Sequence, residues 1–360
     1  MIHKLTIILT IKNRPDFTLR WLGFMNRDLP SIHIIIADSG DGGNFSQPYI
    51  ASKFPMLSFE YFKVDAVEND NDYFPKLEEA LARVRTKYLL LADDDDFFFM
   101  EAAATLCKFL DDNGDYIGAR GSSLTLHLYK PTTTKKNLCH GEYYYAFYNP
   151  TKSIESNSSL ERVRYFTENI SKLDLYNNWY SIWRSDEFRE ILSRIFNSGF
   201  SDPRFAEVML HLTAIYRGKI KCIEEDWYIR QEGTSMLSSM IEEDEKFIRN
   251  WIVNDEFSAA KNYIYKICEA ESTYTRDKLI EYFGIWIRDF IVGKSSPETN
   301  YIQRVLKKIL LPIYLKITAV KIFRIPINIL LLILRSARLI PASWARKRIL
   351  LPSLEEHILR

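Results

Sequence analysis

Four consecutive aspartates at positions 93–96 are the residues of this sequence that most clearly point to chemistry. They follow an apolar segment, residues 88–92, that is typical of a buried strand. Carboxylates crowded at a strand end repel one another unless a cation or solvent neutralises them. Mg²⁺ and Mn²⁺ prefer such oxygen ligands and commonly bridge one or two carboxylates to substrate phosphates. Because alternate side chains of an extended chain share a face, we expect Asp93 and Asp95 to hold such a cation together.

The alternative is a solvated acidic loop or the start of a helix, since aspartate is favoured near helix N-termini. The aspartates, however, follow a buried strand directly, within a chain that alternates between strand and helix patterns. That position favours the metal-binding interpretation.

The elements that must position these carboxylates occupy the first 115 residues. Apolar segments predict strands, and apolar stripes at helical spacing predict the helices between them. The expected strands are residues 4–11, 32–37, 59–64 and 88–92, and the expected helices are residues 16–27, 76–85 and 103–110. This alternation predicts an α/β fold, a parallel sheet covered by helices. Ligands of such sheets bind at the carboxyl ends of the strands, where Asp38 and the four aspartates fall.

The rest of the chain gives a weaker pattern. Residues 114–172 look irregular, residues 179–196 and 203–217 predict helices, and residues 235–291 look largely helical. We therefore expect a catalytic domain over residues 1–235, with a donor half (1–120) and an acceptor half (121–235). A helical region (236–300) and a basic apolar tail (301–360) follow.

Three features resemble the inverting family-2 glycosyltransferases of the GT-A fold. They are the first strand with Asn13 and Arg14, the strand-end Asp38, and the Asp-x-Asp-Asp element after Leu-Leu-Leu-Ala. The run Asn-Arg-Pro-Asp-Phe-Thr-Leu-Arg at residues 13–20 is similar to a bacterial subgroup found in surface-polysaccharide gene clusters. The resemblance covers residues 4–125 well and residues 174–240 weakly.

The resemblance implies transfer of a sugar from a nucleotide-sugar donor to a glycan or lipid-linked acceptor, with inversion and with Mg²⁺ or Mn²⁺. It assigns the metal to Asp93 and Asp95. The residues that it assigns to the donor are Thr10, Asn13, Arg14, Asp38, Lys76, Asp93, Asp94 and Arg230. For Lys76 the alternative is an ordinary exposed helix lysine. The histidine that the family often uses as a third metal ligand is absent, so Gln231, Glu232 or water would replace it.

The general base is the least determined residue. Family-2 enzymes commonly carry Glu-Asp at the start of a later helix, with the aspartate as base, whereas this chain has Glu207-Val208. Glu207 lies off the apolar face of the expected helix, so we expect it to take the role of base. Asp202 is the alternative, although Asp202-Pro203 is also an ordinary helix-capping pair.

Composition excludes several other classes. A formal net charge of +1 argues against binding of nucleic acid through overall charge. The four cysteines form no CxxC pair, which predicts neither a zinc site nor a disulfide framework. The N-terminus runs straight into an apolar strand without a signal-peptide core. We therefore expect a cytoplasmic protein with reduced thiols.

Residues 301–360 carry 12 Lys and Arg against two acids, interleaved with Ile and Leu. Their apolar runs are too short for a bilayer core of about 30 Å. This pattern is typical of helices on an anionic surface, which predicts association with the inner face of the cell membrane. The alternative is that the helices pack on the catalytic domain or within a homo-oligomer.

Two other functions are compatible with parts of the sequence. A sugar-1-phosphate nucleotidyltransferase also uses acidic metal ligands on an α/β sheet, but it carries a glycine-rich loop after the first strand, and residues 10–14 contain no glycine. A non-catalytic membrane-associated scaffold would not need the four aspartates together with Arg230 and Glu207.

Overall fold

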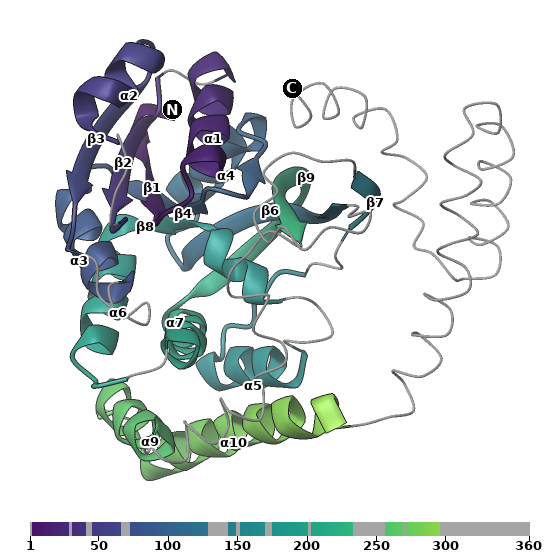
Figure 1. Cartoon of the computed structure of the whole chain (residues 1–360). Helices are drawn as coiled ribbons and strands as arrows, with labels where there is room; N and C mark the ends of the chain where they lie inside the picture. The colour runs from purple at the N-terminus through teal and green to yellow at the C-terminus, as the bar shows by residue number, and fades with distance from the viewer. Residues whose placement is uncertain are drawn as a thin grey trace, which may run out of the picture.

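In this computed structural model the described residues are 2–28, 31–40, 45–65, 73–128, 143–148, 152–169, 175–200, 203–232, 256–269 and 271–295. They form one nine-stranded sheet with helices on both faces (Figure 1). The expected α/β fold is confirmed, and the arrangement is consistent with the GT-A-like sheet that the resemblance implied.

Four parallel strands form the half of the sheet that carries the acidic run. Their order is β3 (Ser58–Lys63), β2 (His33–Asp38), β1 (Leu5–Ile11) and β4 (Tyr88–Asp93). The last three are apolar runs buried on both faces, which is typical of central parallel strands. Ile11 pairs with Asp38, and Thr10 pairs with Asp93. The carboxyl ends of these three strands therefore lie side by side at one edge.

The other half of the sheet is built from later segments. Strand β8 (Ile182–Arg184) runs antiparallel between β4 and β6 (Tyr116–Leu128). Strand β9 (Lys219–Glu232) runs parallel to β6 and pairs with the short β5 (Phe97–Phe98), while β7 (Tyr143–Tyr148) pairs with β6. The prediction that residues 114–172 are irregular is wrong, because β6, β7 and α5 (Ser159–Asn169) lie within that range. Strand β6 is rich in Gly, Ser and Thr, and its long-range pairing overrides weak local propensity.

Alternate strand residues face two separate cores. Helices α1 (Pro15–Asp28), α2 (Gln47–Lys53) and α4 (Glu101–Asp112) pack on the face that Ile7 and Leu9 enter. Helices α3 (Tyr73–Arg83), α6 (Ser185–Phe196) and α7 (Pro203–Arg217) pack on the face that Ile8 enters. This alternation follows from the two-residue repeat of a strand.

The predicted helix over residues 179–196 is wrong in its first part. A short 3-10 helix (Leu175–Tyr180) and strand β8 come first, and α6 begins only at Ser185. Ile182 and Trp183 are completely buried in the sheet, so tertiary packing decides their conformation. Because of this break, Tyr180 ends the 3-10 helix beside β4 and is not part of α6.

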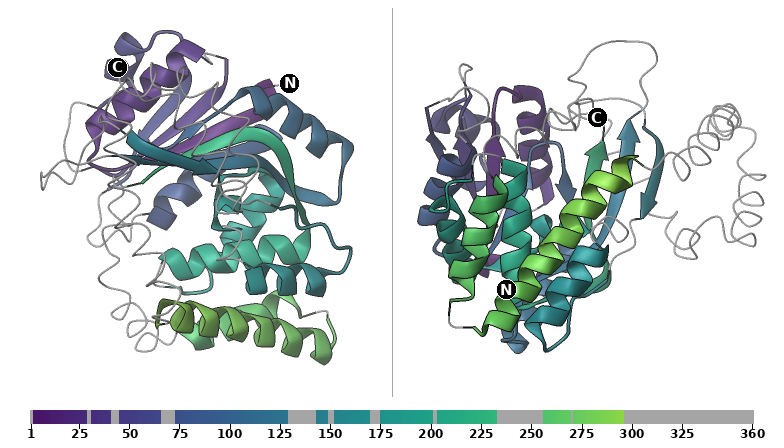
Figure 2. Two further views of the ribbon diagram at one scale, coloured as in Figure 1. Left: turned by 90° about the vertical axis from the view of Figure 1, so that its right-hand side faces the viewer. Right: turned by 90° about the horizontal axis from the view of Figure 1, so that it is seen from below.

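Helices α9 (Glu256–Ile267) and α10 (Thr273–Ser295) form the bottom layer in the left view of Figure 2, beneath α5 and α7. Tyr263, Ile264 and Leu279 are buried in the same core as α7. These two helices therefore extend the core on the α7 face of the sheet. The tail at residues 301–360 lies outside the described residues.

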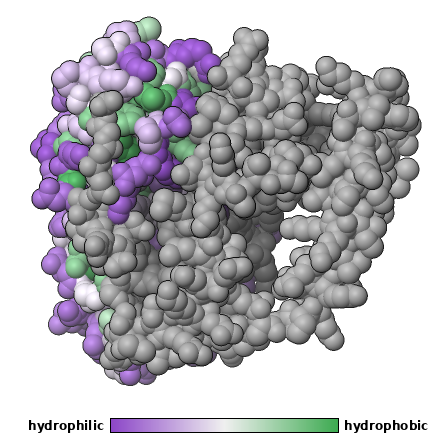
Figure 3. Space-filling view, viewed as in Figure 1, coloured by the Kyte–Doolittle hydropathy of each residue, from purple (hydrophilic) through white to green (hydrophobic). Residues whose placement is uncertain are grey.

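Hydrophilic residues predominate along one edge of the described surface. The outer edge over α3 and α6 is mainly hydrophilic in Figure 3, with smaller hydrophobic areas between. Met56 and Tyr274 are the large hydrophobic side chains that stand out most, with 60% and 65% of their surface exposed. Within the part of the chain that is described, no helix combines the length and apolar character needed to cross a membrane.

We expect Gly121→Ala to destabilise the protein by about 1–3 kcal/mol, the usual cost of overpacking. A β-carbon at Gly121 would lie 2.6 Å from Trp227 Cβ and would also collide with the Glu225 carbonyl of β9. Chemical denaturation measures the loss. Gly114→Ala is the matched control, because nothing lies within 4 Å of its added carbon. Equal stability of the two variants would contradict the close approach of β6 to β9.

Candidate active site

The four aspartates form a tight turn between β4 and β5. The Asp96 amide donates to the Asp93 carbonyl at 3.3 Å, which closes the turn. Asp94, Asp95 and Asp96 are at most 5% exposed, and Asp93 is half-buried. Such burial of carboxylates costs stability unless partners compensate each charge.

Arg14 forms ion pairs with two aspartates of the turn. Its Nη2 lies 2.8 Å from Asp95 Oδ2, and its Nη1 lies 3.4 Å from Asp94 Oδ1. The Thr18 hydroxyl donates to Asp94 at 3.0 Å. Burial raises the pKa of Asp94 to about 7; the charge of Arg14 opposes this rise, and that of Asp95 adds to it.

Asp93 faces a different set of groups. The Tyr180 hydroxyl donates to its Oδ2 at 2.7 Å, and the Thr10 hydroxyl lies 3.5 Å from its Oδ1. Burial raises the pKa of Asp93, the neighbouring charge of Asp95 raises it further, and the hydrogen bond from Tyr180 acts in the opposite direction. Asp93 and Asp95 therefore interact electrostatically although their hydrogen-bond partners differ.

Asp96 anchors the turn to β9. One of its oxygens accepts a hydrogen bond from the Tyr228 hydroxyl. The other accepts one from the backbone amide of Gln231 at 3.0 Å. The Gln231 side-chain oxygen accepts in turn from Arg20 at 2.8 Å. Both oxygens of Asp96 thus accept hydrogen bonds from β9. The side-chain oxygen of Gln231, which the sequence analysis considered as a third metal ligand, already accepts one from Arg20.

The ends of β1 and β2 form a second cluster at the same edge. Asp38 accepts from the Gly40 amide at 2.7 Å and from the Tyr61 hydroxyl at 2.8 Å. Lys76 is only 3% exposed, and its ammonium donates to the Ile11 carbonyl and the Ser39 hydroxyl. The alternative of an exposed lysine is therefore wrong.

Asn13 adopts a left-handed backbone conformation (φ 53°), which asparagine tolerates better than most residues. A β-carbon added at Gly40 would lie only 2.8 Å from Asn13 Oδ1. The turn after β1 therefore lies directly against the turn after β2, beside Asp38.

Glu207 and Arg230 belong to the same electrostatic neighbourhood as Asp93. Burial raises the pKa of Glu207 to about 7, with Arg230 lowering it and Asp93 raising it. Burial also raises the pKa of Tyr73, and the charges of Asp93 and Glu207 add to that rise. Glu207 on α7 is half-buried, whereas Asp202 lies outside the described residues. A carboxylate with a pKa near 7 is well matched to accept a proton at neutral pH.

The carboxylate oxygens at the turn are of the kind that binds a hard divalent cation. Asp93 and Asp95 supply carboxylate oxygens, and their mutual repulsion is a cost that a cation would relieve. Among the described residues, no three His, Cys, Asp or Glu side chains gather into a complete metal site. Magnesium sites of the phosphate-binding type need only one or two carboxylates, because substrate phosphates supply further ligands.

Sequence patterns did not identify the aromatic partners of the turn. Tyr180 and Tyr228 stack with ring centroids 4.2 Å apart, and each donates its hydroxyl to one aspartate of the run. The Trp227 indole donates to the Tyr180 carbonyl at 2.7 Å and completes this support. These contacts join residues far apart in the chain, so no local spacing could have indicated them.

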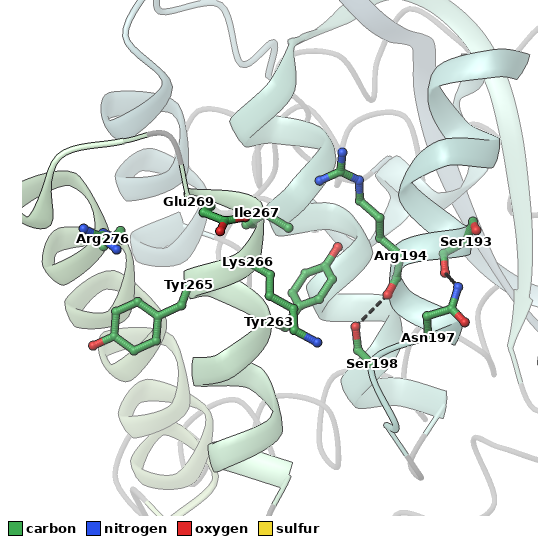
Figure 4. Close-up of a pocket in the computed structure, with 10 residues that line it drawn as sticks. All are labelled: Ser193, Arg194, Asn197, Ser198, Tyr263, Tyr265, Lys266, Ile267, Glu269 and Arg276. Carbon is green, nitrogen blue, oxygen red and sulfur yellow. Dashed lines mark hydrogen bonds between the residues drawn. The ribbon is translucent and has the colours of Figure 1, made fainter.

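One pocket lies away from this site. It has a volume of about 710 Å³ between the end of α6 and α9, and Arg194, Asn197, Tyr263 and Lys266 are among its lining residues (Figure 4). None of the residues that line it belongs to the acidic turn or to the β1 and β2 ends. It therefore plays no part in the arrangement described above.

No family model matches this sequence, and no curated protein matches it. The structure is similar to crystal structures of S. aureus TarS residues 1–349 alone, with UDP and with UDP-GlcNAc. Sequence identity is 12–13%, coverage is 78–82% of this chain and 70–73% of TarS, and TM-scores are 0.45–0.46. At these TM-scores the similarity identifies neither the family nor the reaction.

Proposed function

We propose that the protein is a glycosyltransferase that takes a sugar from a nucleotide-sugar donor and transfers it with inversion. The observation that carries this proposal is the shared location of Asp38 at the carboxyl end of β2 and of Asp93 and Asp95 at and after the carboxyl end of β4, with the end of β1 between them. That edge is where α/β sheets bind nucleotides. The electrostatic coupling of Glu207 and Arg230 to the same site supports it.

In the proposed reaction the oxygen of an acceptor hydroxyl forms a bond to the anomeric carbon of the sugar. The bond from that carbon to the diphosphate breaks, and the nucleoside diphosphate leaves with the electron pair. Glu207 takes the proton of the acceptor hydroxyl. Arg230 is a phosphate ligand in this proposal, because its planar guanidinium matches phosphate oxygens.

Asp93 and Asp95 would hold Mg²⁺ or Mn²⁺. When bound, the cation would neutralise the charge that develops on the leaving diphosphate. Tyr180 keeps the Asp93 carboxylate oriented through its hydrogen bond, and Asp96 fixes the turn against β9. Asp38, Thr10 and Asn13 are proposed to contact the nucleoside, on the strength of their position at the ends of β1 and β2.

The biological setting is part of the proposal and rests on the sequence. The resemblance over residues 13–20 supports a role in bacterial surface-polysaccharide synthesis, with a glycan or lipid-linked acceptor. The basic apolar tail supports association with an anionic membrane surface.

A thermal-shift panel of nucleotide sugars tests the proposed function. We expect one donor to raise the melting temperature in the presence of Mn²⁺ and to do so much less with EDTA, because ligands of the native state stabilise it by mass action. The panel includes UDP-, GDP-, CDP- and dTDP-sugars, with AMP and free sugars as controls. A panel in which no nucleotide sugar stabilises the protein would contradict the proposal.

A further inference from the structure

The contact between Arg14 and Asp95 has a consequence for how the proposed site would be loaded. Asp95 is one of the two residues proposed to hold the cation, yet its Oδ2 lies 2.8 Å from Arg14 Nη2. Arg14 also neutralises Asp94, with 3.4 Å between Nη1 and Oδ1. One guanidinium thus lies against two carboxylates that are almost completely buried.

The pair is held by charge and by stacking. The Arg14 guanidinium lies over the Phe17 ring, with 4.0 Å to its centroid. The Arg14 Nη2 is buried within hydrogen-bond distance of Asp95 Oδ2. The side chain of Arg14 is 15% exposed, whereas those of Asp94 and Asp95 are 4% and 6% exposed. Arg14 is therefore the most exposed of the three side chains.

We infer that Arg14 makes cation binding conditional on the donor, because it occupies Asp95 until a donor phosphate draws it away. A guanidinium matches phosphate oxygens in a bidentate way, so a bound diphosphate offers Arg14 an alternative anion. When Arg14 moves to that anion, its positive charge no longer competes with the metal for Asp95. Binding of the cation and binding of the nucleoside diphosphate are then positively coupled, and thermodynamics requires the coupling to be reciprocal.

This inference rests on the proposed function, and cation binding without donor tests it separately from activity. MnCl₂ is titrated calorimetrically into wild type and Arg14→Met, alone and with saturating UDP or GDP. We expect Mn²⁺ alone to bind Arg14→Met about tenfold more tightly than wild type. We also expect the nucleotide to tighten Mn²⁺ binding in wild type but much less in the variant.

Arg27→Met is the matched control, since Arg27 lies in α1, the helix that Arg14 directly precedes, and over a phenylalanine ring, with 5.8 Å to the Phe24 centroid. It should bind Mn²⁺ like wild type. Asp95→Asn in the Arg14→Met background should remove the gained affinity. Arg14→Lys serves if the methionine variant does not fold; it keeps the charge without the planar fork, so it should bind Mn²⁺ alone nearly as weakly as wild type but show weaker coupling to the nucleotide.

Equal Mn²⁺ affinity of wild type and Arg14→Met, with nucleotide coupling intact in both, overturns the inference and leaves the proposed function standing. Absence of Mn²⁺ binding in every protein, with and without nucleotide, overturns both the inference and the proposed cation site.

Discussion

Replacement of Asp95 by alanine is expected to abolish sugar transfer, with a loss of at least about 10³-fold, equivalent to about 4 kcal/mol of transition-state stabilisation. The variant removes one of the two carboxylates proposed to hold the cation. Donor binding should lose its dependence on Mn²⁺ at the same time. Transfer from a labelled donor and calorimetric titration of that donor measure the two effects.

The fold should survive this substitution. Arg14 keeps Asp94 as an ion-pair partner. The substitution also removes the negative charge of Asp95, which adds to the raised pKa of both Asp93 and Asp94. Asp112→Ala is the matched control, because Asp112 is an exposed aspartate that pairs with Lys108 at 2.6 Å, away from the turn. If Asp95→Ala transfers sugar at a rate close to that of the control, the assignment of the metal to Asp95 is wrong.

Replacement of Glu207 by glutamine is expected to lower turnover by about 10²–10⁴-fold, the usual scale for a general base, while donor affinity is retained. The base must be ionised to accept a proton. Since burial raises the pKa of Glu207 to about 7, the rate of the wild type should fall as the pH drops below about 7. The residual rate of the variant should lack this acidic limb.

Stability provides a second readout for Glu207. Its pKa in the folded protein lies above the ordinary value, so the neutral form stabilises the fold at low pH, and this contribution is lost as the pH rises through about 7. Glu207→Gln should therefore melt higher than the wild type at pH 8, with no such advantage at pH 4. Glu161→Gln, at an exposed glutamate paired with Arg164, is the control. Unchanged turnover of Glu207→Gln would leave Asp202 as the candidate base.

The sequence predicted the parts of the fold that depend on local pattern. Strands β1 to β4 and helices α1, α3 and α7 agree with the expected segments to within about three residues. Continuous apolar runs and helical stripes determine these elements, because their burial follows from their own composition. The position of Asp38 and Asp93 at one edge follows from the same strands once they are known to be parallel.

Strands β6 and β9 could not be predicted in this way. Their residues alternate weakly between polar and apolar, and each is stabilised by pairing with the other and not by its own propensity. The burial of two site residues could not be predicted for a related reason. The sequence left Lys76 open between a donor-binding residue and a surface lysine, and it predicted Tyr180 as part of a long helix. Their hydrogen bonds reach residues 65 and 87 positions earlier in the chain.

The anchoring of the turn by β9 determines when the site can assemble during synthesis. Asp96 and Gln231, which hydrogen-bond to each other, are 135 positions apart in the chain. The first four strands can pair on the ribosome long before β9 emerges, but until then Phe97 and Phe98 lack their partner strand. A nascent chain at that stage carries four crowded carboxylates beside an uncovered aromatic surface, a state that favours aggregation. We therefore expect chaperones to be needed for this interval, and donor binding to begin only after residue 231 has left the ribosome.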